Sequence, residues 1–291
     1  MNIEKFRGGW AIPDNEVISF YKNIDYSNVL IDKNPAIEFI YNFDKYIMSS
    51  KENKLFGLDE FKHKTFVHGT CLSFEAFWMR HHNRRFKCFK GEFFYHQANW
   101  KKFHRCDYID DKGVSFNDAV VISLPFSDYC TEHSKMREVL DECEKLKVPV
   151  LIDCAYYLIT KDINFNFSEY NCITDITFSL SKGFYRADKL RAGIRYSKLF
   201  YDDYVDIMNQ YDAVSYLSAY VGNKIVTNFP PDYAITKFRD KQLKFCKDNN
   251  LVPSDCVIFA FGSDKYEQLK RETGVNRLCI SDQIGDRIDE K

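Results

Sequence analysis

The chain has 291 residues, 45% of them hydrophobic and 16% aromatic, and a formal net charge of −1. This is enough for one large domain with a small second lobe. A net charge near zero gives no general attraction to nucleic acid or to a membrane surface, and no apolar run reaches the roughly eighteen residues of a membrane span. The ten cysteines form no C-x-x-C pair, and the first residues lack the apolar stretch of a secretory signal. We therefore expect a cytoplasmic protein with reduced thiols.

Residues 1–50 predict an arm followed by a helix. Two glycines and a proline around Trp10 are typical of irregular backbone. Asn34 followed by Pro35 predicts the start of a helix with Asn34 as its N-cap. The residues of this helix that we expect to be buried are Ile37, Ile40, Phe43 and Ile47.

A short turn, His68-Gly69-Thr70, separates a predicted strand over 65–67 from a predicted helix over 72–79. Gly69 would let the backbone approach a ligand closely. Thr70 can cap the helix and also donate to an anion at the helix N-terminus. Taken alone, an ordinary threonine cap after a glycine turn is the simpler interpretation.

The segment from Arg80 to Lys90 is rich in cations. Two interpretations are open: a phosphate or nucleic-acid patch, or the solvated end of a helix, where cations offset the helix dipole. The histidines and cysteines nearby match no spacing of metal ligands, so we expect no metal site.

A repeating strand–helix–strand pattern begins at residue 119. Apolar strands are predicted over 119–124, 148–152 and 173–178, and an amphipathic helix over 136–146. This spacing is typical of a βαβ unit and therefore of an α/β fold with a mainly parallel sheet. Ligands in such sheets bind beyond the carboxyl ends of the strands. Three polar groups lie there in the sequence, namely Ser127, Asp153 and the run Ser179–Lys182.

The last hundred or so residues predict connecting helices and a small α/β tail. We expect helices near 198–211, 213–227 and 235–249, then strands near 256–261 and 276–280. The predicted organisation is an arm and helix over 1–50, a large domain over 51–200, and connecting helices with a reduced small lobe over 201–291.

Lys182 is an unusual residue to find just beyond a buried strand. A desolvated lysine has a lowered pKa and is a nucleophilic amine that can form a Schiff base with a carbonyl. The neighbouring hydroxyls of Ser179 and Ser181, with Arg191 downstream, could hold a phosphate. In isolation a solvated loop lysine is the simpler interpretation.

Four segments together resemble the fold-type I pyridoxal-phosphate enzymes, most closely the class I/II aminotransferase branch headed by aspartate aminotransferase. They stand in the family order, and the chain is an unusually short member by this resemblance. It implies a three-layer α/β/α large domain that binds pyridoxal 5′-phosphate, and a small α+β lobe made from the chain ends. The segments are His68-Gly69-Thr70, Pro125-Phe126-Ser127, Asp153-Cys154-Ala155-Tyr156, and Ser179-Leu180-Ser181-Lys182 with Arg191.

The resemblance implies a catalytic role for three residues. Lys182 would form the Schiff base with the cofactor and, once released by substrate, would act as the general base. Asp153 would pair with the pyridine nitrogen and keep it protonated, so that the ring can take up electrons. Tyr156 would hydrogen-bond the phenolic oxygen.

Further cofactor contacts follow from the same resemblance. Tyr95 is expected to stack on the ring, with His96 as the alternative. The family's Asn-Pro-x-Gly turn is replaced by Pro125-Phe126-Ser127-Asp128, so its asparagine contact to the cofactor oxygen is missing, and Ser127 could substitute for it. Tyr26 would reach the phosphate of a partner subunit, which implies a homodimer with shared sites. The residues expected around the phosphate are Gly69, Thr70, Ser179, Ser181 and Arg191.

The resemblance also implies three residues that contact substrate. Arg277 would bind a carboxylate, and Gly9 and Trp10 match the arm that closes over substrate. The implied reaction is transamination between an amino acid and a 2-oxo acid. Decarboxylation, elimination by a lyase, racemisation and cyclisation remain alternatives. An alternative of another class is a non-catalytic binding or regulatory module that uses the segment Arg80–Lys90, although nucleic acid is an unlikely partner for so neutral a chain.

Overall fold

The computed structural model describes residues 3–30, 34–103, 106–185 and 190–286. Its centre is a seven-stranded sheet in which every strand but β9 runs in the same direction. The strands in spatial order are β2 (His63–Val67), β9 (Gly193–Ser197), β8 (Ile173–Ser179), β6 (Val150–Asp153), β5 (Asp118–Ser123), β3 (Arg85–Cys88) and β4 (Cys106–Tyr108). The mainly parallel α/β sheet predicted from the sequence is confirmed.

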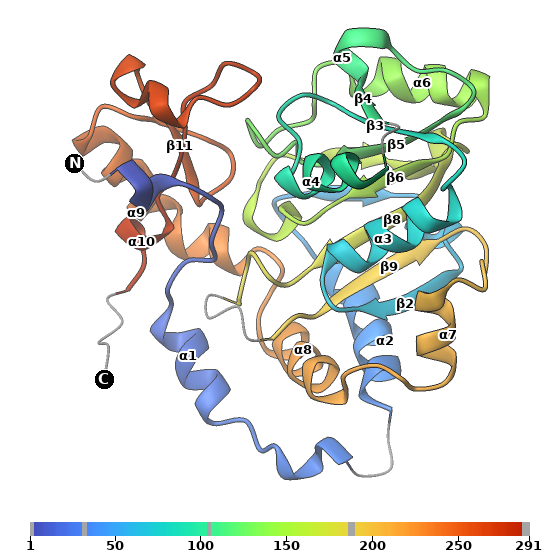
Figure 1. The fold of residues 1–291 in the computed structure, drawn as a ribbon. Helices are drawn as coiled ribbons and strands as arrows, with labels where there is room; N and C mark the ends of the chain where they lie inside the picture. The colour runs from blue at the N-terminus through green and yellow to red at the C-terminus, as the bar shows by residue number, and fades with distance from the viewer. Residues whose placement is uncertain (1–2, 31–33, 104–105, 186–189, 287–291) are drawn as a thin grey trace.

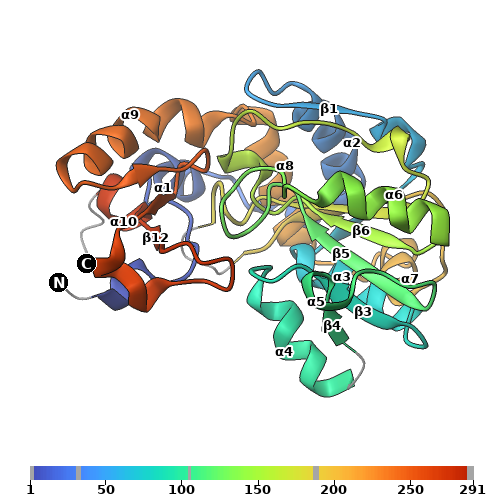
Figure 2. The ribbon, with the colours of Figure 1, turned by 90° about the horizontal axis from the view of Figure 1, so that it is seen from above.

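Helices cover both faces of this sheet, because the apolar strands are buried on both sides. Val120 and Ile122 of β5 pack with α2 (Pro35–Met48) and α6 (Met136–Leu146), and α8 (Tyr216–Asn228) packs on α2. Ala119 and Val121 face the other way, toward α3 (Thr70–Arg80). Figure 2 shows α3, α4 (Phe94–Phe103) and α7 (Tyr204–Gln210) on that second side, which gives three layers.

Helix α2 begins as the sequence predicts, but its buried face is turned. The side chain of Asn34 accepts a hydrogen bond from the amide of Ala36 at 2.9 Å and caps the helix. Phe43 and Ile47 are buried as expected and Ile40 is half-buried, but Ile37 is 65% exposed, whereas Phe39 is fully buried. The rings of Phe39 and Phe43 pack against aromatic residues of β2 and β8, and this contact fixes the rotation of the helix.

The helix expected near 198–211 is present but shorter, and a strand precedes it. Residues 193–197 form β9, which pairs with β2 on one side and β8 on the other. Helix α7 begins only after Asp203, whose carboxylate accepts from the amides of Val205 and Asp206 at 3.1 Å each and caps the helix.

Both chain ends contribute to a small lobe beside the sheet. Figure 1 shows the blue N-terminal segment lying against the orange and red C-terminal elements. The apolar core of the lobe joins Phe6 and Ile12 to Phe238, Phe259 and Leu278. Its elements are η1 (Ile3–Phe6), α9 (Tyr233–Asp248), β10 (Val252–Pro253), β11 (Phe259–Phe261), η6 (Asp264–Leu269), β12 (Arg277–Cys279) and α10 (Ser281–Ile284). The predicted small α+β lobe from the chain ends is thus confirmed.

The remaining elements connect these two parts. Strands β1 and β7 pair with each other in parallel, apart from the large sheet. The connecting elements are α1 (Asn15–Lys22), η2 (Ser27–Leu30), β1 (Lys54–Phe56), η3 (Leu58–Glu60), α5 (Ile109–Lys112), η4 (Tyr157–Ile159), β7 (Asn164–Asn166) and η5 (Phe167–Glu169). Among the helices of the described ranges, none is both long and apolar enough to span a bilayer.

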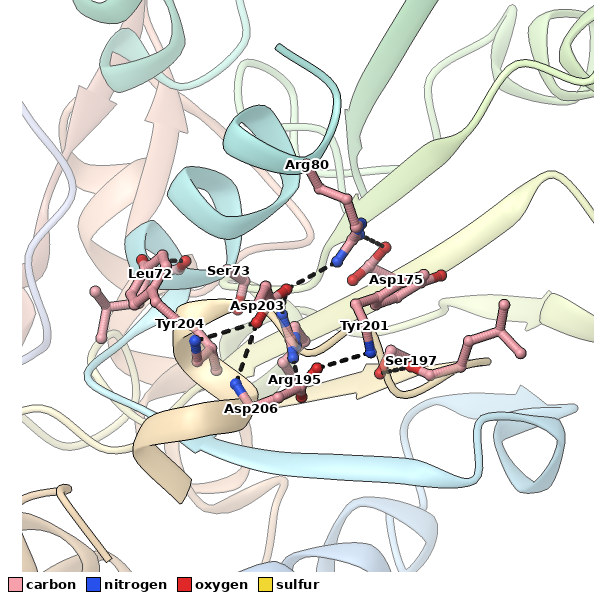
Figure 3. A network of polar contacts seen from close by, with 12 residues as sticks. Leu72, Ser73, Arg80, Asp175, Arg195, Ser197, Tyr201, Asp203, Tyr204 and Asp206 are labelled. Atoms are coloured by element: carbon pink, nitrogen blue, oxygen red, sulfur yellow. Dashed lines mark hydrogen bonds and ion pairs between the residues drawn. The ribbon is translucent and has the colours of Figure 1, made fainter. Parts of the chain in front are cut away.

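A buried ionic network ties α3 and α7 to the sheet (Figure 3). Arg195 on β9 is fully buried and binds Asp203 at 2.6 Å and also Asp206. Arg80, at the end of α3, binds Asp203 at 3.0 Å and the fully buried Asp175 of β8. Since two helices and two strands share these charges, the network fixes α3, the helix that leads away from the candidate site.

Candidate active site

A cavity lies where the carboxyl ends of the parallel strands meet the small lobe. It collects the residues that follow β2, β5, β6 and β8, together with part of the N-terminal arm. Its lining residues are Gly9, Trp10, Ala11, His68, Gly69, Thr70, Cys71, Phe93, Ser123, Pro125, Ser127, Asp153, Ala155, Tyr156, Ser179, Ser181, Lys182 and Arg191. Most of the residues singled out in the sequence therefore share one cavity, as expected at this edge of an α/β sheet.

One end of the cavity is built to bind an anion. The Ser179 hydroxyl donates to the Ser181 hydroxyl at 2.8 Å and accepts from the Ser181 amide at 3.1 Å, which turns the chain just after β8. The side chain of Arg191 lines the same end. Two hydroxyls and a guanidinium in one place form the kind of donor set that binds phosphate.

The start of α3 completes this end. Gly69 has φ +78° and ψ 170°, which glycine adopts without strain. A Cβ atom there would lie 3.7 Å from Cδ of Arg191, 3.8 Å from Oγ of Ser179 and 3.9 Å from Oγ of Ser181. A side chain at Gly69 would thus fill the cradle. Thr70 is the first residue of α3, so its amide lies at the positive end of the helix dipole.

Asp153 stands at the other end, at the carboxyl terminus of β6. Its side chain is only 3% exposed, and its Oδ1 atom accepts from the amide of Ala155 at 3.0 Å. Burial raises the pKa of Asp153 to about 7, while the Ala155 amide and the charge of Lys182 act in the opposite direction. A positively charged partner stabilises the ionised form of a buried carboxyl, so Asp153 is suited to pair with a cationic group of a ligand.

Tyr156 and Ser127 lie near this carboxyl and differ in what they can offer a ligand. Both side chains line the cavity. Ser127 donates its hydroxyl proton to the carbonyl oxygen of Gly91 at 2.8 Å, so toward the cavity its oxygen can act only as an acceptor in this arrangement. The Tyr156 hydroxyl is therefore the better donor to an anionic oxygen of a ligand.

Lys182 extends from the turn after β8 into the cavity. Leu180 is fully buried and anchors this turn, and the Phe184 amide donates to the Leu180 carbonyl at 3.0 Å. The Nζ atom of Lys182 donates to the carbonyl oxygen of Gly9 and lies 5.7 Å from the centre of the Tyr156 ring. The ammonium group is thus held between the arm and the acidic end of the cavity.

Within the aromatic segment 93–96, the residue that lines the cavity is Phe93, and not Tyr95 or His96 as expected. Helix α4 begins at Phe94, so Phe93 precedes the helix and points into the cavity. Tyr95 lies on the helix, stacked on Trp78 at 5.8 Å, and donates its hydroxyl to Glu75. His96 is buried against Phe74 and Trp78. The run of aromatic residues does not show which ring faces the cavity. The start of the helix at Phe94 determines this.

Arg277 does not line the cavity but lies directly behind its wall. Its Nη1 atom donates to the carbonyl oxygen of Ser127, and its Nη2 atom donates to that of Gly8 at 3.3 Å. The guanidinium stacks over the ring of Phe259 at 4.2 Å. Of the substrate residues predicted from the sequence, Gly9 and Trp10 are therefore in the cavity, whereas Arg277 is covered by the arm.

Tyr26 lies outside the cavity of its own chain. Its side chain is 42% exposed, and its hydroxyl donates to the carbonyl oxygen of Tyr21 at 3.0 Å. The structure contains one chain, so the expected contact with a partner subunit stays a prediction.

Sequence reasoning did not select Cys71 or Ser123, which also line the cavity. Ser123 is the last residue of β5 and the register partner of Asp153, so its position at the end of a predicted strand was the available signal. Cys71 follows Thr70 in the turn of α3, and nothing in the sequence distinguished it from the other cysteines.

The basic segment from Arg80 to Lys90 is not a free cationic surface. Arg80 binds Asp175 and Asp203, and Arg85 binds Asp118 at 2.8 Å. The side chain of Lys87 is fully buried and lies 3.6 Å from Asp118, and Lys90 pairs with Asp111. Within the described ranges, no group of histidine, cysteine or acidic side chains is arranged to hold a metal ion.

Comparison with known proteins identifies the fold. No protein-family model and no curated protein matches this sequence. Among solved structures, the histidinol-phosphate aminotransferase of Clostridium acetobutylicum has a TM-score of 0.63 at 13% identity, over 97% of this chain and 94% of that one. A PLP-bound protein of Clostridium difficile 630, described as an aminotransferase, has a TM-score of 0.62 at 11% identity, over 88% and 77%.

A third similar structure belongs to a protein named for a different reaction. The L-threonine-O-3-phosphate decarboxylase of Porphyromonas gingivalis has a TM-score of 0.60 at 14% identity, over 94% of this chain and 93% of that one. At such identities the similarity is one of fold. The chain thus has the fold of the fold-type I aminotransferases, as the motifs in its sequence implied.

Proposed function

We propose that this protein is a pyridoxal-phosphate-dependent enzyme of the aminotransferase type that acts on an amino acid. The observation that carries the proposal is the convergence of Lys182, Asp153 and the anion cradle on one cavity. A lysine, a buried carboxyl and a phosphate-type cradle are the three features that this cofactor needs. A similar structure with the same fold is PLP-bound by its description, which supports the choice of cofactor.

The residues present fit the cofactor at both ends. Ser179, Ser181, Arg191, Gly69 and Thr70 would hold the phosphate, since their donors converge where a Cβ on Gly69 would intrude. At the ring end, the candidates are Asp153 for the pyridine nitrogen, Tyr156 for the phenolic oxygen and Phe93 for the ring face. When bound, the cofactor supplies an aldehyde that reacts with amines and a ring that takes up electrons from the substrate.

Lys182 is proposed to have two tasks. Its amine would attach the cofactor, and after exchange with substrate it would move a proton at the substrate Cα. The Gly9 carbonyl that now accepts from Lys182 belongs to the arm, so arm position and lysine position are linked. Asp153 would keep the ring nitrogen protonated through its buried carboxyl.

We further propose transamination as the reaction, with a 2-oxo acid as acceptor. Arg277 would bind the substrate carboxylate once the arm moves, because Gly8 now occupies one edge of its guanidinium. Decarboxylation is the second candidate, favoured by the decarboxylase among the similar structures. A homodimer in which Tyr26 reaches the neighbouring phosphate is part of the same proposal, and its exposed side chain leaves it available for such a contact.

The test is the visible spectrum of the purified protein with pyridoxal phosphate, before and after a panel of amino acids. We expect a violet-absorbing band that borohydride fixes covalently on Lys182. The variant Lys182→Ala should lose the band and all turnover while staying folded. The matched control is Lys198→Ala, which removes a lysine that donates to the carbonyls of Tyr170 and Asn171.

The response to amino acids then separates the reactions. Bleaching by an amino donor, with recovery on adding a 2-oxo acid, supports transamination. Release of carbon dioxide without a need for an acceptor would replace it with decarboxylation. An unchanged spectrum in Lys182→Ala, or no band with the native protein, would contradict the assignment of the cavity.

A further inference from the structure

Glu92 is a buried carboxyl beneath the candidate site. It lies in the turn between β3 and α4, next to Phe93, and its side chain is only 1% exposed. Its Oε1 atom accepts from the amide of Ser123 at 2.8 Å, and its Oε2 atom accepts from the hydroxyl of Ser123. Both carboxylate oxygens thus hold the same serine.

Ser123 connects this carboxyl to Asp153. The two residues are register partners at the carboxyl ends of β5 and β6, and both line the cavity. The amide of Leu124, next in the chain, donates to the Asp153 carbonyl at 2.9 Å. Two buried carboxyl groups therefore flank one serine at the ring end of the cavity.

The surroundings give the two carboxyl groups unequal positive charge. The charge of Lys182 acts on Asp153, whereas within the described ranges no lysine or arginine forms an ion pair with Glu92. Arg271 donates to the main-chain oxygens of Gly91 and Glu92 at 3.1 and 3.4 Å, but its Nε atom binds Asp128. Burial raises the pKa of Glu92 to about 8, and the charge of Asp153 adds to this, against the hydrogen bonds from Ser123.

We propose that Glu92 is a positioning residue for the ring nitrogen of the cofactor. It orients Ser123 beside Asp153. A protonated ring nitrogen paired with Asp153 would favour the ionised form of Glu92, and that negative charge would in turn support the pairing. This inference rests on the proposed cofactor and adds a residue that does not itself line the cavity but binds Ser123, which does.

The experiment compares two ligands that differ only at the ring nitrogen. The dissociation constants of pyridoxal phosphate and of its carbocyclic analogue, with CH in place of the nitrogen, are measured by spectral titration. We expect Glu92→Gln to weaken pyridoxal phosphate about tenfold, the equivalent of one pKa unit, and to change the analogue less than about twofold. The matched control is Glu272→Gln, which alters a carboxylate that binds the Gly91 amide but not Ser123.

The titration of Glu92→Gln can support or overturn the proposed role of Glu92. Equal weakening of both ligands by Glu92→Gln means that Glu92 only supports the fold, and overturns the proposal, as does no weakening of either. If Glu92→Gln does not fold, Ser123→Ala replaces it, with a loss of about threefold expected for pyridoxal phosphate alone; loss for both ligands overturns the proposal. If the native protein binds neither ligand, the proposed function itself is wrong, and the role of Glu92 falls with it.

Discussion

The Nζ atom of Lys182 donates a hydrogen bond to the carbonyl oxygen of Gly9, which lies 173 residues earlier in the chain. The preceding carbonyl, that of Gly8, accepts from Arg277. Two consecutive peptide groups of the N-terminal arm therefore hold the two cations that the proposed reaction would use. If substrate binds these cations as proposed, it competes with the arm for them, so the arm would have to shift when substrate binds.

A larger side chain at position 9 should displace the N-terminal arm. A Cβ atom on Gly9 would lie 2.8 Å from the Tyr156 hydroxyl and 3.0 Å from Cζ of Phe259. We expect Gly9→Val to lower kcat/KM about tenfold or more, because small displacements in a site are costly. Steady-state kinetics would show this, with Arg7→Ala as the control on the exposed part of the same arm. Native kinetics in Gly9→Val would mean that the arm position is irrelevant to turnover.

Phe93 and Tyr95 offer a direct test of which ring faces the cofactor. We expect Phe93→Leu to weaken pyridoxal phosphate about fivefold, roughly 1 kcal/mol for one lost ring contact. Tyr95→Leu removes the other ring, together with its hydrogen bond to Glu75, and should change the dissociation constant less than about twofold. Spectral titration measures both. A larger loss in Tyr95→Leu than in Phe93→Leu would reinstate Tyr95 as the stacked residue.

Arg277 should discriminate substrates by their carboxylate. Arg277→Lys keeps the charge but loses the two-pronged guanidinium, so we expect a loss of about 2–3 kcal/mol, or about 30- to 150-fold in KM for amino acids. Lysine is chosen because alanine would also leave the carbonyls of Ser127 and Gly8 without their donor. An amine without a carboxylate should react equally well with both proteins. Equal changes for both substrates would remove Arg277 from carboxylate binding.

The buried carboxyl of Asp153 predicts a pH dependence of the cofactor-free protein. Burial raises its pKa in the folded state to about 7, above its ordinary value of 3.8. Between these values the folded state retains a proton that the unfolded state has lost. The free energy of unfolding should therefore fall as the pH rises, by about 1.4 kcal/mol per unit from this group.

Urea unfolding of the native protein and of Asp153→Asn at pH 5 and pH 7 tests this dependence. The asparagine variant should lose about 2 kcal/mol less between the two pH values, since other groups contribute equally to both proteins. Parallel pH profiles would show that Asp153 titrates normally.

The ionic network in Figure 3 predicts a large loss of stability. Asp206→Ala leaves Arg195, which is fully buried, without one of its two carboxylates. Breaking a buried pair costs about 3–5 kcal/mol in unfolding free energy. Asp248→Ala is the matched control, because it breaks an exposed pair with Lys244, and exposed pairs contribute little to stability. A similar loss of unfolding free energy in the two variants, measured by urea unfolding, would mean that the network does not stabilise the fold.

The parallel sheet and the place of the cavity could both be predicted from local patterns. Residues 119–124 are an almost continuous apolar run, a further strand is indicated over 173–178, and the polar residues that follow the two strands must meet at one edge of a parallel sheet. This reasoning needs only local patterns and the chain direction, which is why Asp153, Ser179 and Lys182 could be placed together without coordinates.

The tertiary structure decided the features that depend on contacts between distant segments. Which aromatic residue faces the cavity depends on α4 beginning at Phe94, and which face of α2 is buried depends on the rings of β2 and β8. The cations of segment 80–90 left two interpretations open in the sequence, a binding patch or a solvated helix end, whereas in the structure Arg80 is neutralised by Asp175 and Asp203, about a hundred residues away. Glu92 is connected to Asp153 through its hydrogen bonds to Ser123. Packing and charge pairing act between residues that folding brings together, and a linear pattern contains no record of those distances.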